Sequence, residues 1–461
     1  MINPQQWQRH IEDSKDIFFK RRFDIFRAFE FSINYSLFYN SLIESKLIEA
    51  SREVFGTDSP PGVAIFSFGA PARKEMFGGS DADVAFYRAG NDTDKELRLR
   101  EKFVELLQGF NFTKVDTPIW GTLGDIQRYM TTSVTEANQV MEAQFVCGDP
   151  GFGKSVEQLR ASLYDKDVIA RNLVFQFFYF DQYYTKKASP GHLNLKYCAG
   201  GIRDLLFPMW YAQLKEGIDR NLKTTALERG LNALYKDGLL SNKELIDILR
   251  YSSSIAFIRD EVIRLTPGDM DGKLTSQKAV EVYQRRLHLF ESSQDIKRLV
   301  EKSRRKIISA KAKVWEGLCQ YFAASKSKSW NACFKKALVQ ENLELPSELE
   351  NDEVINTARI WNFSANSAKQ SSYYIKNISN SDSWVVLASL LSNPHVYGNI
   401  IDSIIKRRGL TPGYEYLLEI AARNPNLKTG TLEFILEDDS TEPRFKKPAL
   451  ELAKRLKLWP K

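Results

Sequence analysis

The chain has few of the residues that form histidine–metal and disulfide sites. Its 461 residues include four histidines and four cysteines, and no two cysteines form a CxxC pair. No histidine is adjacent to an aspartate, and no two histidines share a helical turn. These spacings exclude a zinc ribbon, a disulfide framework and a histidine-based metallohydrolase centre.

Long apolar runs are also missing. A membrane-spanning helix needs about 20 consecutive apolar residues, and no stretch of the chain approaches that length. The opening residues Met1–Gln6 contain no signal-peptide core. We therefore expect a cytoplasmic protein without membrane contact, in a compartment where cysteines stay reduced.

What the chain does contain is typical of a globular protein, with 43% hydrophobic and 27% charged residues. Its length suggests about three domains at roughly 150 residues each. Apolar runs bounded by turns predict strands at 63–68, 82–87 and 112–117, with a helix at 94–107. This order indicates a small mixed sheet. Helical spacing dominates elsewhere, notably at 5–55, where five phenylalanines share one face, and at 137–145, 168–184 and 203–265.

The predicted architecture is α+β, with a small sheet domain embedded in a mainly helical protein. Near the C-terminus, Leu390–Pro394 recurs as Ala421–Pro425 at an offset of 31 residues, which is typical of stacked, HEAT-like helical pairs. The predicted parts are N-terminal helices (1–55), the sheet domain (56–125), a helical domain (126–290), a basic helical region (291–380) and C-terminal helical repeats (381–461).

Positive charge is concentrated in one segment. The chain carries a net charge of +7, but residues 285–336 hold 14 Lys or Arg and 4 Asp or Glu, which is +10 and leaves −3 for the rest. Aromatic residues interleave with these cations, a pattern that can bind RNA through phosphates and stacking: Trp315, Tyr321, Phe322 and Trp330. The alternative is a long solvated helix with a buried apolar face formed by Val300, Ile307, Ile308 and Val314.

The strongest candidate site is a pair of aspartates at the start of the second strand. Asp81 and Asp83 are two residues apart, so their side chains share a strand face and repel unless a cation lies between them. Carboxylate oxygens suit Mg²⁺, or Mn²⁺ in its place, and Asp116 in the third strand is the candidate third ligand. Gly69 and Ala70 form a turn whose backbone can approach a phosphate. The alternative is that both aspartates are turn or cap residues.

This segment resembles the catalytic turn of DNA polymerase β-type nucleotidyltransferases, and most closely that of the bacterial PII uridylyltransferases. Their Gly-Gly-x-Gly-Arg-Gly-Glu-Leu and Ser-Asp-x-Asp pattern corresponds to Gly69–Met76 and Ser80–Asp83, with Ala70, Ala72 and Lys74 in place of glycines. The resemblance implies metal binding by Asp81 and Asp83, completed by Asp116. It also implies nucleotide contacts from Gly69, Ala70, Arg73 and Ser80.

Two further segments resemble the same family. His192–Leu205 resembles its Asn-x-Lys and Gly-Gly-Leu-Arg-Asp-Ile pattern, and 239–283 resembles its helical region more loosely. In the first of these, Lys196, Arg203 and a helix N-terminus would suit a triphosphate. The alternative is a helix start with a surface pair of Arg203 and Asp204. The family's His-Asp domain has no counterpart here, so removal of the nucleotide is not expected.

Residues 148–155 fit the P-loop pattern G-x-x-x-x-G-K-[ST] in every required position. A P-loop must follow a buried strand and open a helix. The helical spacing predicted upstream, over 137–145, disfavours that context. An NTPase that uses this segment remains an alternative.

Together these features predict a nucleotidyltransferase that moves an NMP from an NTP to a macromolecular hydroxyl and releases pyrophosphate. A protein acceptor is slightly favoured over RNA, because the resemblance points to protein and the basic segment points to RNA. The alternative of another class is a catalytically inactive nucleotide sensor or scaffold on the same fold.

Overall fold

The computed structural model describes residues 9, 25–76, 82–90, 94–108, 110, 115–132, 134–185, 193–218, 224–266, 271–286, 289–340, 343–362, 379, 381–408, 415–437, 449–450 and 453–454. Within these it gives the backbone alone at 25–29, 82, 115–120, 131–132, 135, 181–185 and 415–416. The chain forms two compact units. The first comprises Met1–Gln127, Gln139–Lys166 and Asp181–Leu318, and the second comprises Arg128–Asn138, Asp167–Phe180 and Cys319–Lys461.

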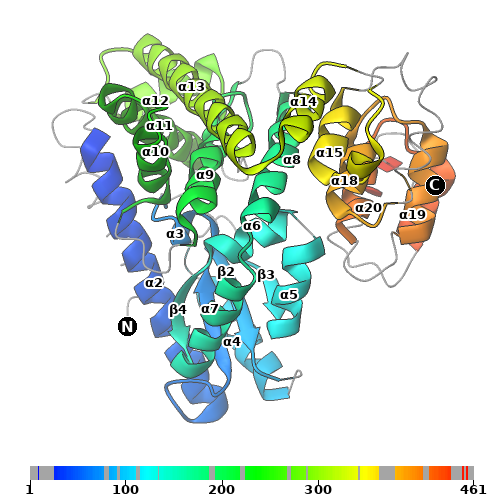
Figure 1. The fold of residues 1–461 in the computed structure, drawn as a ribbon. Coiled ribbons are helices and arrows are strands. Elements are labelled where there is room, and N and C mark those ends of the chain that lie inside the picture. Colours follow the sequence, from blue (N-terminus) through cyan, green and yellow to red (C-terminus); the bar gives the residue numbers. More distant parts are fainter. Residues whose placement is uncertain are drawn as a thin grey trace. The chain divides into compact units, whose positions relative to one another are not determined.

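The first unit contains a four-stranded sheet in the order β3-β2-β1-β4 (Figure 1). β1 (Val63–Ser67) is antiparallel to β2 (Ala82–Arg88) and to β4 (Gln144–Gly148), whereas β3 (Val115–Gly121) runs parallel to β2. All five residues of β1 are buried, so both faces of the sheet are covered at this strand. The first two predicted strands are confirmed. β3 lies later than predicted because its pairing with β2 continues to Gly121.

The fourth strand corrects the prediction of a helix over 137–145. Helix α6 (Val134–Glu142) ends before β4, and Phe145 pairs with Phe66 of β1, with ring centroids 5.5 Å apart. Pairing with a buried neighbouring strand thus overrides the local helical spacing. The sheet consequently includes residues beyond the predicted domain boundary at 125.

Helices make up most of the rest of the first unit. α2 (Ile25–Phe55) contacts β4, and α7 (Pro150–Ser162) contacts β1 and β4. The phenylalanine stripe predicted over 18–29 lies outside the described side chains. The other helices are α3 (Gly69–Ala72), α4 (Asp94–Gln108), η1 (Ile202–Leu205), α9 (Leu206–Glu216), α10 (Ala226–Lys236), α11 (Asn242–Leu265) and α12 (Ser276–Arg285). A two-stranded sheet pairs β5 (Leu193–Asn194) with β6 (Lys273–Leu274).

Some helices contribute residues to both units, because the unit boundaries fall within them. These are α5 (Leu123–Thr132), α6, α8 (Lys166–Thr185) and α13 (Ser293–Ser325). The helix predicted at 168–184 is α8, and Phe175, Phe177 and Phe180 on it are buried as expected. No helix in the described part of the chain combines the length and apolar character that a membrane crossing requires.

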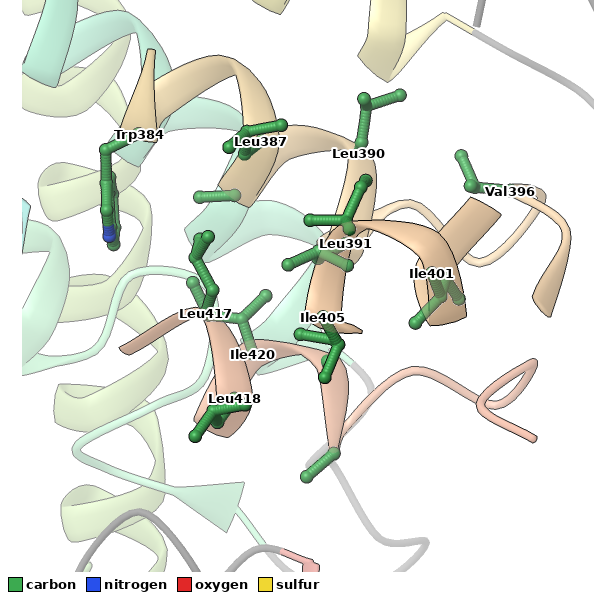
Figure 2. Packing of buried hydrophobic residues seen from close by; sticks show 14 of the residues in the cluster. Trp384, Leu387, Leu390, Leu391, Val396, Ile401, Ile405, Leu417, Leu418 and Ile420 are labelled. Atoms are coloured by element: carbon green, nitrogen blue, oxygen red, sulfur yellow. The ribbon is translucent and has the colours of Figure 1, made fainter. Parts of the chain in front are cut away.

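The second unit is helical, and its helices recur at regular intervals. α15 (Glu353–Trp361), α18 (Trp384–Ser392) and α20 (Glu415–Ala421) begin 31 residues apart, as do α19 (Gly398–Arg408) and α21 (Thr429–Glu437). Each of α15 and α20 contacts α18. The remaining helix of this part is α14 (Lys328–Ala337). Figure 2 shows the shared core, in which Trp384, Leu387 and Leu391 of α18 lie among Ile401, Ile405, Leu417 and Leu418.

Buried asparagines connect successive helices of this series. The side-chain amide of Asn393 donates to the Ile360 carbonyl at 2.5 Å, and that of Asn424 donates to the Leu391 carbonyl at 2.7 Å. Each acceptor lies 33 residues upstream of its donor. The side-chain oxygens also have equivalent roles, since each accepts from the backbone N–H two residues downstream. Both asparagines therefore belong to the repeating unit.

Candidate functional site

The turn after β1 is held against Asp83. The N–H of Phe68 donates to the Asp83 carbonyl at 3.2 Å, so the turn begins beside the start of β2. Gly69 has a φ of +63°, and a Cβ at this position would overlap Asp83 Oδ2 and lie 3.2 Å from its Cγ. Glycine is therefore favoured twice, by its backbone conformation and by the carboxylate packed on it.

The register of the sheet brings the predicted third carboxylate beside the second. Asp83 and Asp116 are paired residues of the parallel strands β2 and β3. Neighbouring strands lie about 4.8 Å apart, and paired residues point to the same face. The Asp116 side chain and all of Ser80 and Asp81 lie outside the described part of the structure.

The turn closes with a Schellman motif that ends α3. The N–H of Lys74 donates to the Pro71 carbonyl at 3.2 Å, and that of Glu75 donates to the Ala70 carbonyl at 3.0 Å. Lys74 occupies the C′ position with a φ of +58°, where glycine is usual. This conformation accounts for the glycine that the related pattern has at this position.

Arg73, predicted to contact the nucleotide, is paired with two carboxylates. Its Nε donates to Glu75 at 3.1 Å, and its Nη1 donates to Glu142 at 2.8 Å. The three side chains are largely buried, with exposed fractions of 14%, 19% and 8% for Arg73, Glu75 and Glu142. Burial opposes the charge of Arg73, but the two carboxylates raise its pKa. Burial raises the pKa of Glu75 despite the nearby guanidinium.

The remaining oxygens of these carboxylates bind other helices. Glu142 accepts from the indole N–H of Trp210 on α9 at 2.9 Å, and Glu75 accepts from the N–H of Leu227 on α10 at 3.0 Å. The Arg73 carbonyl accepts from the N–H of Ala226 at 3.0 Å. Sequence reasoning missed Glu142, because it lies 69 residues from Arg73 and belongs to no recognisable motif.

The Gly-Gly segment forms a second compact turn. The Asn194 side chain accepts from the N–H groups of Lys196 and Tyr197 at 3.1 and 2.9 Å. Gly200 has a φ of +73°, and a Cβ there would overlap the backbone of Arg304 on α13. The predicted helix start is present as η1 followed by α9. This turn is therefore built against α13.

Asp204 is not part of a surface pair with Arg203, which corrects that alternative. It is 6% exposed, accepts from the N–H of Gly200 at 2.7 Å and pairs with Lys311 at 3.1 Å. Its carboxylate thus fixes the turn. The two predicted phosphate contacts flank one ring, with Lys196 Nζ 5.3 Å and the Arg203 guanidinium carbon 5.7 Å from the Tyr197 centroid.

The P-loop-like segment does follow a strand, but helix α7 begins within the motif at Pro150. The Asp149 side chain caps this helix by accepting from the N–H groups of Gly151 and Phe152 at 2.9 and 3.1 Å. Those N–H groups would face a phosphate in a P-loop. A Cβ at Gly153 would lie 2.5 Å from the Phe145 ring, so this glycine serves packing.

The basic segment agrees with the alternative of an amphipathic helix. The face of α13 in the first unit is buried at three- and four-residue spacings: Ile296, Val300, Ser303, Ile307, Ala310, Val314 and Leu318. Ile308, predicted on that face, is 43% exposed. Phe322 and Trp330, predicted as stacking residues, are buried, and Trp330 donates to Asp352. Several cations have carboxylate partners, among them Lys306 with Asp247 and Lys326 with Asp167.

The two turns are those expected of a phosphate-handling transferase. Residues 181–305 match the GlnD PII-uridylyltransferase family, so 125 of the 461 residues form a uridylyltransferase-like segment. The matched segment contains the Gly-Gly turn and begins after the Gly69 turn and Asp83. No curated protein matches the chain.

Proposed function

We propose that the protein is a Mg²⁺-dependent nucleotidyltransferase that moves an NMP from an NTP to a macromolecular hydroxyl and releases pyrophosphate. The observation that supports this most directly is the packing of Gly69 on Asp83, with Asp116 at the paired position of the next strand. A side chain at Gly69 would fill the space beside the carboxylate. The uridylyltransferase-like segment at 181–305 adds independent support and makes UTP the first donor to test.

Each part of the site has a distinct role in this proposal. Asp81, Asp83 and Asp116 would hold Mg²⁺ or Mn²⁺, which neutralises charge on the transferring phosphoryl group when bound. The turn at Gly69 and Ala70, with Ser80, would approach the phosphates through small residues and backbone N–H groups. Lys196 and Arg203 would contact the triphosphate as cations at the start of η1 and α9.

The acceptor that we favour is a hydroxyl on a protein. An RNA interface would need exposed aromatic rings among the cations of 285–336. Phe322 and Trp330 are instead buried, and Tyr321 donates its hydroxyl proton to Asp167 at 3.2 Å. The family with which 181–305 matches is described as acting on a PII protein, which agrees with a protein acceptor.

The test is transfer of label from each α-³²P-labelled NTP to a cell lysate, with pyrophosphate release measured alongside. We expect Mg²⁺-dependent labelling of a protein band, and loss of at least roughly 100-fold in Asp83→Asn, because a metal ligand contributes several kcal/mol of charge stabilisation. Asp58→Asn is the matched control, since Asp58 lies in an exposed ion pair. Binding of nucleotide without pyrophosphate release from any NTP would instead identify an inactive sensor.

A further inference from the structure

Arg73, Glu75 and Glu142 form a buried cluster, here called the Arg73 clasp. Its five hydrogen bonds are those described above: two from the guanidinium, two to the outer carboxylate oxygens, and one to the Arg73 carbonyl. They join the Gly69 turn to α6, α9 and α10. The clasp therefore connects the turn beside Asp83 to helices within the uridylyltransferase-like segment.

The charges of the clasp are unsuited to a phosphate ligand. Two carboxylates surround one guanidinium, which gives the cluster a net charge of −1 when all three groups are ionised. A triphosphate approaching Arg73 would have to displace a carboxylate and leave it buried without its partner, which is strongly unfavourable. The negative cluster would also repel the polyanion.

The clasp lies along the same helical path as the predicted phosphate contacts. Trp210, which donates to Glu142, follows Arg203 by seven residues through η1 and α9. At 1.5 Å per residue, the two positions are roughly 10 Å apart along that path. Fixing Trp210 to the clasp thus fixes the start of α9 relative to the Gly69 turn.

We propose that Arg73 is a positioning residue, which acts with Glu75 and Glu142 to hold the carboxylate turn and the Gly-Gly turn in register. This assignment deepens the proposed function and rests on it. Misplacement of reacting groups by about 1 Å can cost roughly 100-fold in rate. The clasp would therefore affect the rate of transfer more than the affinity for nucleotide.

The experiment compares Arg73→Met, Glu142→Gln and the double variant by kcat, NTP dissociation constant and urea unfolding. We expect each single change to lower kcat by roughly 100-fold, with the NTP dissociation constant changed less than about threefold, and the double variant to be no worse than the poorer single variant. Arg52→Met is the matched control, because Arg52 forms an exposed pair with Asp58. Tenfold weaker NTP binding in Arg73→Met, with Glu142→Gln unaffected, would overturn the proposal.

A second measurement does not depend on transfer activity. With 5-fluorotryptophan incorporated, the resonance of Trp210 can be assigned by comparison with Trp210→Phe. We expect Arg73→Met and Glu142→Gln to shift it in nucleotide-free protein, because Glu142 accepts from its indole N–H. An unshifted resonance would overturn the clasp even if transfer occurs. A shifted resonance in a protein without transferase activity would support the clasp and reject the proposed function.

Discussion

Replacing Gly69 by alanine tests the contact between the turn and Asp83. The new Cβ would overlap Asp83 Oδ2, so the carboxylate or the start of β2 must move. The left-handed φ of +63° adds a conformational cost of about 1–2 kcal/mol. Overpacking of this kind costs about a further 1–3 kcal/mol.

Gly56→Ala separates these two contributions. Gly56 has a similar φ of +74°, and nothing lies within 4 Å of the position that a Cβ would take. We therefore expect Gly56→Ala to lower the free energy of unfolding by the conformational cost alone, about 1–2 kcal/mol. Gly69→Ala should lower it further and should also lower transfer by roughly 100-fold through displacement of a reacting group.

Urea unfolding gives the two stabilities, and Mg²⁺-dependent pyrophosphate release gives the activities. The reasoning requires that the two variants differ in both measurements. If Gly69→Ala matched Gly56→Ala in stability and kept normal transfer, the packing of Gly69 on Asp83 would have no functional importance.

Four further changes have defined outcomes. Lys74→Gly should raise the free energy of unfolding by about 1 kcal/mol, because it relieves a left-handed lysine; a less stable variant in urea would contradict this. Lys154→Ala should change the calorimetric NTP dissociation constant by less than about twofold, whereas loss of binding would restore the P-loop interpretation. Asp149→Ala should cost about 1–2 kcal/mol as a lost cap. Backbone N–H donors lower the pKa of Asp149, so this loss should be full above about pH 4 and shrink as unfolding is measured at lower pH. Asn424→Ala should cost about 2–4 kcal/mol in thermal or urea unfolding, because its buried partners lose their donor; an unchanged midpoint would argue against a structural role.

Local sequence was sufficient for those features that depend on neighbouring residues. The buried run at 63–67 and the turn at Gly69 could be predicted because burial and glycine chemistry act over a few residues. β4 could not be predicted in this way, since Phe145 is drawn into the sheet by pairing with Phe66. The P-loop pattern likewise matched by letter, whereas the Asp149 cap that begins the helix early depends on local geometry.

The candidate site was predictable only in part, for a related reason. The pairing of Asp83 with Asp116 agrees with the three-carboxylate prediction, because parallel strands align their ends. The role of Arg73 differs from the expected phosphate contact, because its partner Glu142 is distant in sequence. Lys74 did carry a signal, since the related pattern has glycine at that position and the structure shows a left-handed conformation there.

The asparagine contacts of the second unit impose a rule on chain length. Asn393 and Asn424 each reach a carbonyl 33 residues upstream, although they are 31 residues apart. Removing 384–414 would delete one period of 31 residues and present Asn424 to the Ile360 carbonyl that Asn393 now uses. Changes of whole periods would preserve this bonding frame, and other changes would break it, much as a reading frame tolerates whole codons. Evolution can therefore lengthen or shorten this part of the chain in discrete steps.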